Sequence, residues 1–96
     1  MDKEILNMQG KIKQEMTEEE KEKREEILAA IAAQLPPIIF SNWRGWRDVL
    51  PISPGTVKND ESLGVGPKDF VFVGRVKGRT RESMIEYLRG KVRFTA

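Results

Sequence analysis

Two groups of polar side chains in the second half of the chain have the types and spacing needed to bind an anionic partner. The first group places four cations within seven residues: Arg75, Lys77, Arg79 and Arg81. The second group precedes it and combines a glycine with side chains that donate hydrogen bonds: Ser53, Gly55, Thr56, Lys58 and Asn59. Guanidinium, ammonium, hydroxyl and amide groups bind phosphate oxygens and base edges. These residue types predict contacts with a polyanion.

The residue types that the chain lacks narrow the chemistry further. Its sequence has no histidine and no cysteine, which removes Ser-His-Asp catalysis, imidazole metal sites and thiolate zinc sites. The glycines around Gly66 match neither the GxGxxG nor the GxxxxGK phosphate-binding pattern. The carboxylates are numerous but form no pair with supporting neighbours. We therefore expect no enzyme activity, no cofactor and no metal site.

A first short helix is expected over residues 42–49. Ser41 can cap it, Trp43 and Trp46 fall on one of its faces, and Pro51 ends it. The two tryptophans are expected to be anchors of the core. The alternative is a platform on which nucleic-acid bases stack.

A second helix is expected over residues 54–63. Ser53 followed by Pro54 is typical of a helix start, and Leu63-Gly64 fits a helix end. Two helices joined by a tight turn form a helix-turn-helix, whose second helix lies in the major groove with its N-terminal residues at the base edges. The second polar group would then contact DNA. The alternative is a helical hairpin with a polar surface.

A β-hairpin and a last helix follow. Phe70–Val73 is predicted as a strand, Gly74-Arg75 as its turn and Val76–Arg79 as the returning strand. Thr80 can cap the last helix, and Gly90 ends it. The first polar group thus lies at and after the hairpin turn, where its cations would meet a phosphate backbone.

The fold predicted for residues 36–96 is mainly α within the α+β class. It is a winged helix-turn-helix with a small β-hairpin as the wing, and an extra N-terminal helix precedes it. Its core is expected to contain large apolar side chains from every element: Trp43, Trp46, Val57, Phe70, Phe72, Met84, Ile85 and Leu88.

The N-terminal third is expected to be an arm on this domain. Residues 1–16 contain Gly10, few apolar side chains and no cap, so we expect them to be flexible. The alternative is an exposed strip that binds a partner. Thr17 and Glu20 form a capping box at the start of a charged amphipathic helix over residues 17–35. Its apolar stripe consists of Ile27, Leu28, Ile31 and Leu35. The helix packs on its own domain or serves as a surface for a partner or for self-association.

Charge is unevenly distributed along the chain. Residues 1–35 carry 6 basic and 9 acidic side chains, whereas residues 36–96 carry 11 basic and 6 acidic ones. A basic body joined to an acidic arm suggests that the body alone meets a polyanion. No apolar run reaches the roughly 18 residues of a membrane span, so we expect no membrane contact and a cytoplasmic location.

The stretch from Phe40 to Leu88 resembles the MerR-like winged helix of phage excisionases and AlpA-type prophage regulators. Six short segments carry the resemblance: Ile52-Ser53, Thr56-Val57, Gly66-Pro67, Phe72-Val73-Gly74-Arg75, Arg81-Glu82-Ser83-Met84 and Tyr87-Leu88. The resemblance implies binding of double-stranded DNA through the helix that Ser53 opens and the wing around Arg75. It also implies a role in site-specific recombination or prophage gene control.

Two hypotheses for function therefore remain. The first is a sequence-specific DNA-binding protein of the excisionase or prophage-regulator type. The second is a protein-interaction adaptor that has the winged-helix fold and no DNA affinity. Asp60 and Glu61 favour the adaptor, because carboxylates near the second polar group would repel a phosphate backbone.

Overall fold

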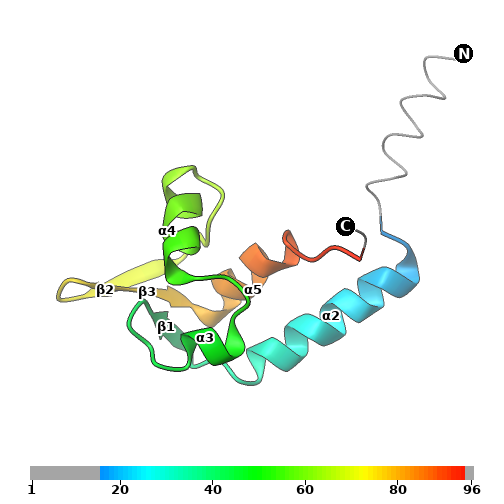
Figure 1. The fold of residues 1–96 in the computed structure, drawn as a ribbon, viewed down its shortest axis with the longest axis horizontal. Helices are drawn as coiled ribbons and strands as arrows, with labels where there is room; N and C mark the ends of the chain where they lie inside the picture. The colour runs from blue at the N-terminus through cyan, green and yellow to red at the C-terminus, as the bar shows by residue number, and fades with distance from the viewer. Residues whose placement is uncertain (1–15, 95–96) are drawn as a thin grey trace, which may run out of the picture.

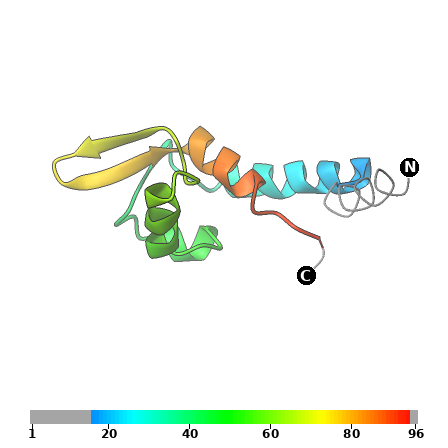
Figure 2. The same ribbon diagram turned by 90° about the horizontal axis from the view of Figure 1, so that it is seen from above.

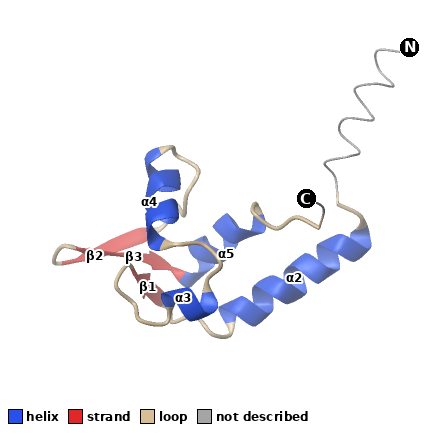
Figure 3. Ribbon diagram, viewed as in Figure 1, coloured by secondary structure: helices blue, strands red, loops and turns tan. Residues whose placement is uncertain are grey.

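The computed structural model describes residues 16–94, which form an α+β arrangement of helices around one antiparallel sheet (Figure 1, Figure 3). Within this range the elements are α2 (Glu18–Ala32), β1 (Ile38–Phe40), α3 (Trp46–Val49), α4 (Pro54–Ser62), β2 (Phe70–Val73), β3 (Val76–Thr80) and α5 (Arg81–Arg89). The flexibility predicted for residues 1–16 concerns positions that, except for Met16, lie outside the described residues. No helix in the described range combines the length and the apolarity needed to cross a bilayer.

Helix α2 begins at the predicted capping box. The Glu20 N–H donates to Thr17 Oγ1 (3.1 Å), and the Thr17 N–H donates to Glu20 Oε1 (2.9 Å). The second half of α2 lies beside α5 (Figure 1), and there Leu28 joins the core. Ile27, expected in the same stripe, is instead 43% exposed, because the next position along a helix is rotated by about 100°. The apolar half of this helix thus packs on its own domain.

The three strands form a sheet in the order β1-β3-β2, with both pairs antiparallel. The predicted hairpin is confirmed, and Gly74 adopts the positive φ of 62° that its tight turn requires. Phe40 pairs with Gly78 across β1 and β3. A Cβ atom at Gly78 would lie 2.6 Å from Ile38 Cγ2, so only glycine lets β1 lie this close.

The expectation that β2 contributes to the core is wrong. Phe70 is 45% exposed and Phe72 is 61% exposed. The reason is topological, because β2 is an edge strand and the hairpin extends beyond the helices (Figure 2). No helix of the described part of the chain lies over its outer part, so the apolar side chains of β2 are exposed.

The helix expected over residues 42–49 is also shorter than predicted. It spans only Trp46–Val49, and Gly45 precedes it without a side-chain capping bond. Ser41 therefore does not cap a helix, and its hydroxyl bonds to β3 instead. Gly45 allows the ring of Trp43 to lie against the backbone, since a Cβ there would be 2.5 Å from that ring.

The last two helices begin at the predicted caps. Ser53 Oγ accepts from the Thr56 N–H (3.2 Å) at the start of α4. Thr80 Oγ1 likewise accepts from the Ser83 N–H (3.2 Å) at the start of α5. After α4, Gly64 takes a positive φ of 78°, the conformation in which a chain commonly leaves a helix.

The core lies where α2, α3, α4 and α5 meet β1 and β3. It consists of Leu28, Leu35, Ile39, Trp46, Leu50, Val57, Met84, Tyr87 and Leu88. Four predicted core residues are confirmed as buried: Trp46, Val57, Met84 and Leu88. Trp43 and Ile85 pack against this cluster while staying partly exposed. The indole N–H of Trp46 donates to the Ile52 carbonyl (2.7 Å), which joins α3 to the turn before α4.

We predict that Trp46→Ala lowers the free energy of unfolding by about 3–5 kcal/mol, because it empties a large buried site. Urea denaturation of dilute protein, followed by circular dichroism, measures the loss. Phe72→Ala is the control, and as a surface change it should alter stability by less than about 0.5 kcal/mol. Equal losses from the two variants would show that the exposure assigned to β2 is wrong.

Candidate functional site

A groove of about 730 Å³ lies between α4 and the β2–β3 hairpin. Five of the predicted site residues line it: Gly55, Lys58, Arg75, Lys77 and Arg79. Glu61 and Ser41 complete its polar walls. Members of both polar groups thus line the same groove, one group from α4 and the other from the hairpin.

The other four predicted site residues lie outside this groove. Ser53 and Thr56 are joined by the capping contacts, with their hydroxyl oxygens 3.0 Å apart. Asn59 is exposed, and the helical repeat places it with Gly55 on the side of α4 opposite Val57. Arg81 donates to the Leu35 carbonyl (3.2 Å) near the end of α2, so it supports the fold rather than the groove.

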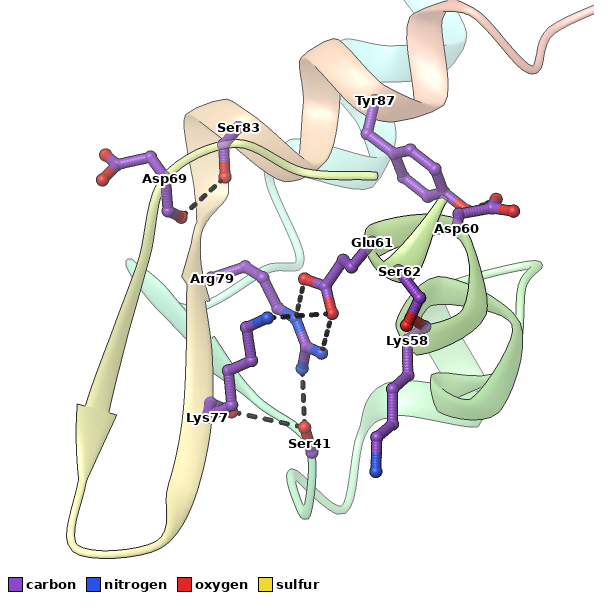
Figure 4. A network of polar contacts seen from close by, with 10 residues as sticks. All are labelled: Ser41, Lys58, Asp60, Glu61, Ser62, Asp69, Lys77, Arg79, Ser83 and Tyr87. Carbon is purple, nitrogen blue, oxygen red and sulfur yellow. Dashed lines mark hydrogen bonds and ion pairs between the residues drawn. The ribbon is translucent and has the colours of Figure 1, made fainter. Parts of the chain in front are cut away.

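A buried ion pair forms the inner wall of the groove (Figure 4). Arg79 donates to both oxygens of Glu61, from Nε to Oε2 at 2.9 Å and from Nη2 to Oε1 at 2.7 Å. The remaining guanidinium nitrogen, Nη1, donates to Ser41 Oγ (2.6 Å). Lys77 Nζ lies 3.2 Å from Glu61 Oε1. We call these four residues the Glu61 cluster; it joins α4, β3 and the turn after β1.

The Glu61 cluster changes the role expected for Arg79. Only 1% of Arg79 is exposed, and its charge is compensated by the Glu61 carboxylate. In this arrangement Arg79 could meet a phosphate backbone only by leaving a buried pair, which disfavours the contact expected of it. Burial by itself would raise the pKa of Glu61, but the hydrogen bonds and charges of Arg79 and Lys77 outweigh it and hold this pKa below its ordinary value.

The neighbouring acid of α4 is also turned inward. The Tyr87 hydroxyl donates to Asp60 Oδ2 (2.6 Å), and Lys91 Nζ lies 3.0 Å from the same oxygen. The hydrogen bond from Tyr87, followed by that from Lys91, lowers the pKa of Asp60. Burial and the Asp60 carboxylate raise the pKa of Tyr87. Both carboxylates of α4 thus serve as tethers, Asp60 to α5 and Glu61 to β3.

Gly66 allows the chain to pass close to the Glu61 cluster on its way to β2. A Cβ atom at this position would lie 2.8 Å from the Glu61 backbone nitrogen and 2.9 Å from Glu61 Cα. Any side chain would therefore push the loop away from α4. Gly66 and Pro67 are both buried, which gives this short segment a structural role in holding the hairpin beside α4.

Two cations beside the Glu61 cluster are exposed and can bind an external anion. Lys58 and Arg75 are exposed, and neither takes part in an ion pair among residues 16–94. Figure 4 shows the Lys58 side chain pointing away from Glu61. The groove thus has an inner wall whose one carboxylate is paired with two cations, and a cationic rim, which is an arrangement suited to binding an anion.

Sequence reasoning did not assign Ser41, Asp60, Glu61 or Tyr87 to this site. The pairing of Glu61 with Arg79 spans 18 positions and that of Tyr87 with Asp60 spans 27. No local spacing rule covers such distances. The one available signal is the pair of acids in a short helix that carries a single cation, Lys58, which indicates that these carboxylates have partners elsewhere in the fold.

We predict that Glu61→Gln lowers the free energy of unfolding by about 3–5 kcal/mol, because it leaves the Arg79 guanidinium buried without a counter-charge. Urea denaturation measures the loss. The matched control is Glu25→Gln at the half-exposed pair with Arg89, where the loss should be much smaller. The double variant Glu61→Leu/Arg79→Met should recover most of the loss, since an apolar pair often replaces a buried ion pair well. A Glu61→Gln protein as stable as the Glu25→Gln protein would contradict this assignment.

A second prediction concerns the pH dependence of stability. Glu61 has a folded pKa below the ordinary value of 4.5, so its contribution is present above that value and is lost as the pH falls through the folded pKa. Asp60 acts in the same direction relative to 3.8. The melting temperature should therefore decrease as the solution is acidified from neutral pH to about pH 2. In Glu61→Gln the decrease should be shallower; an unchanged pH profile would exclude Glu61 as a source.

Comparison of the chain with protein-family profiles, with curated proteins and with solved structures finds no match to any of them.

Proposed function

We propose that this chain is a sequence-specific DNA-binding protein of the winged helix-turn-helix type. In this proposal α4 enters the major groove and the β2–β3 hairpin lies against the phosphate backbone. The observation that carries the proposal is the inward orientation of Asp60 and Glu61. Tyr87 and Lys91 bind Asp60, and Arg79 and Lys77 bind Glu61. The main objection to a phosphate backbone beside α4 is thereby removed.

The order of elements supports this function. A short helix, a turn, a second helix, a hairpin and a last helix follow one another from α3 to α5. That is the element order expected of a winged helix-turn-helix, in which the second helix reads DNA. The resemblance to excisionases and prophage regulators supports the same conclusion, and with it a role in recombination or prophage gene control.

The charge of the exposed surface around α4 gives further support. Lys58 on α4 and Arg75 at the hairpin turn flank the groove from opposite sides. Each can neutralise a phosphate, and the counterions released from DNA would favour binding. Gly55 and Asn59 occupy the outer side of α4, where an amide can make a bidentate contact with adenine. Phosphate contact and base contact are thus assigned to different residues.

The test is a salt titration of DNA binding. A binding sequence is first selected from random duplexes, and fluorescence anisotropy then gives the affinity at a series of salt concentrations. Lys58→Ala and Arg75→Ala should each weaken binding to all duplexes and flatten the slope of log K against log salt by about one. Lys23→Ala is the matched control, since it removes an exposed cation from the distal half of α2. Equal slopes for all three variants and the parent would refute this DNA-binding geometry.

The base contact proposed for α4 is tested by a separate measurement, which compares two duplexes. Asn59→Ala should bring the affinity for the selected duplex closer to that for a scrambled duplex, because a bidentate base contact is worth about 1–3 kcal/mol of discrimination. Affinity for the scrambled duplex itself should change little. A variant that loses the same factor on both duplexes would assign Asn59 to the backbone instead.

A protein-interaction adaptor is the second candidate function, and the exposed strand β2 favours it. Phe70, Val71, Phe72 and Val73 are all exposed, and apolar surface of this kind often marks a protein contact. The salt titration separates the two functions. An adaptor without DNA affinity would show no selected duplex and no salt slope.

A further inference from the structure

Among residues 16–94, strand β2 has one unpaired edge, and the strand consists entirely of apolar residues. It pairs with β3 on one side only, because the sheet order is β1-β3-β2. All four of its side chains are exposed, from Phe70 at 45% to Val73 at 62%. An edge strand without a charge, a proline or a bulge is a template for pairing with another strand. Such an edge is therefore a candidate site for pairing with the strand of another molecule.

The register of the hairpin identifies the backbone groups on this edge. Antiparallel strands alternate between residue pairs that exchange hydrogen bonds and pairs that do not. The Thr80 N–H donates to the Asp69 carbonyl (3.0 Å), so Val71 and Val73, two and four positions further on, also bond to β3. The N–H and C=O groups of Phe70 and Phe72 therefore point outward from the sheet.

We propose that β2 pairs antiparallel with β2 of a second copy of this chain, with Phe72 of the two copies facing each other across a two-fold axis. In this register Phe72 exchanges both backbone hydrogen bonds with Phe72 of the second copy. The two three-stranded sheets become one continuous six-stranded sheet. The contact is isologous and therefore closes after two copies.

Charge complementarity favours a second copy and selects the register. When Phe72 faces Phe72, Asp69, which directly precedes β2, comes next to the turn of the other copy that carries Arg75. Both residues are exposed, and neither side chain has an ion-pair partner among residues 16–94. Figure 4 shows the Asp69 carboxylate pointing away from Ser83 and the body. The alternative two-fold register, centred on Val71, would instead place Asp69 opposite Val73.

This pairing is independent of DNA and is tested without it. Sedimentation equilibrium of the full chain over a range of concentrations should show a reversible monomer–dimer equilibrium. Phe72→Lys should raise the dimer dissociation constant by at least about tenfold, because it places two like charges directly opposite each other. Leu63→Lys is the control, since Leu63 is equally apolar and 68% exposed but lies at the end of α4; it should leave the constant unchanged. Circular dichroism checks that each variant is folded.

Engineered cysteines test the register, since the chain has none of its own. In the proposed pairing the two Phe72→Cys positions lie about 5.5 Å apart between Cα atoms, which a disulfide spans. Mild oxidation should therefore link Phe72→Cys into a dimer. Val71→Cys should not link, because the two positions are offset by about 7 Å along the strand.

Reversal of charge gives a second, non-covalent test of the register. Asp69→Arg or Arg75→Asp alone should weaken the dimer, and the double variant Asp69→Arg/Arg75→Asp should restore it. Linkage of Val71→Cys in place of Phe72→Cys would overturn the Phe72 register. A parent chain that remains monomeric at every concentration would overturn self-pairing and leave the edge to an extended segment of another protein.

Discussion

The buried ion pair between Glu61 and Arg79 is the interaction on which the arrangement of this small domain depends. It connects a helix to a strand 18 positions away, and Ser41 and Lys77 satisfy the remaining groups from two further points of the chain. Removing two charges from water costs several kcal/mol for each ion, which good geometry only partly offsets. The ion pair therefore acts mainly by fixing the position of α4 relative to the hairpin, because any other placement would leave a buried charge without a partner.

The same pair determines the electrostatics of the outer surface. A helix with adjacent carboxylates at Asp60 and Glu61 would repel an anion if both faced solvent. Asp60 bonds to Tyr87 and Glu61 to Arg79, so the outward side of α4 is left with neutral polar groups and Lys58. Structural and functional requirements are thus met by one arrangement: the acids that hold α4 in place are the acids that an anionic partner must not encounter.

Local signals in the sequence predicted the starts of α2, α4 and α5 and the hairpin, whereas the start of α3 was wrongly placed at Ser41 and long-range contacts could not be predicted. Thr17, Ser53 and Thr80 act through hydrogen bonds to residues three positions away, so their types alone are informative. Phe72 and Arg79 were assigned opposite environments to those observed. A continuous apolar strand such as β2 does not tell whether a helix covers it, and a cation after a turn does not tell whether a carboxylate lies across from it.

The two proposals share Arg75 at the hairpin turn but otherwise use different elements, since α4 reads DNA and the edge of β2 forms the contact between copies. Arg79 and Phe72 project from the face of the sheet that carries α4, whereas strand pairing uses the edge. A two-fold axis between antiparallel strands within one sheet runs perpendicular to that sheet. Both copies of α4 would then lie on the same face of the six-stranded sheet, related by the two-fold symmetry that inverted half-sites in DNA share. The exposed apolar edge, which is a liability for an isolated monomer, would thus determine the spacing between two DNA-reading helices.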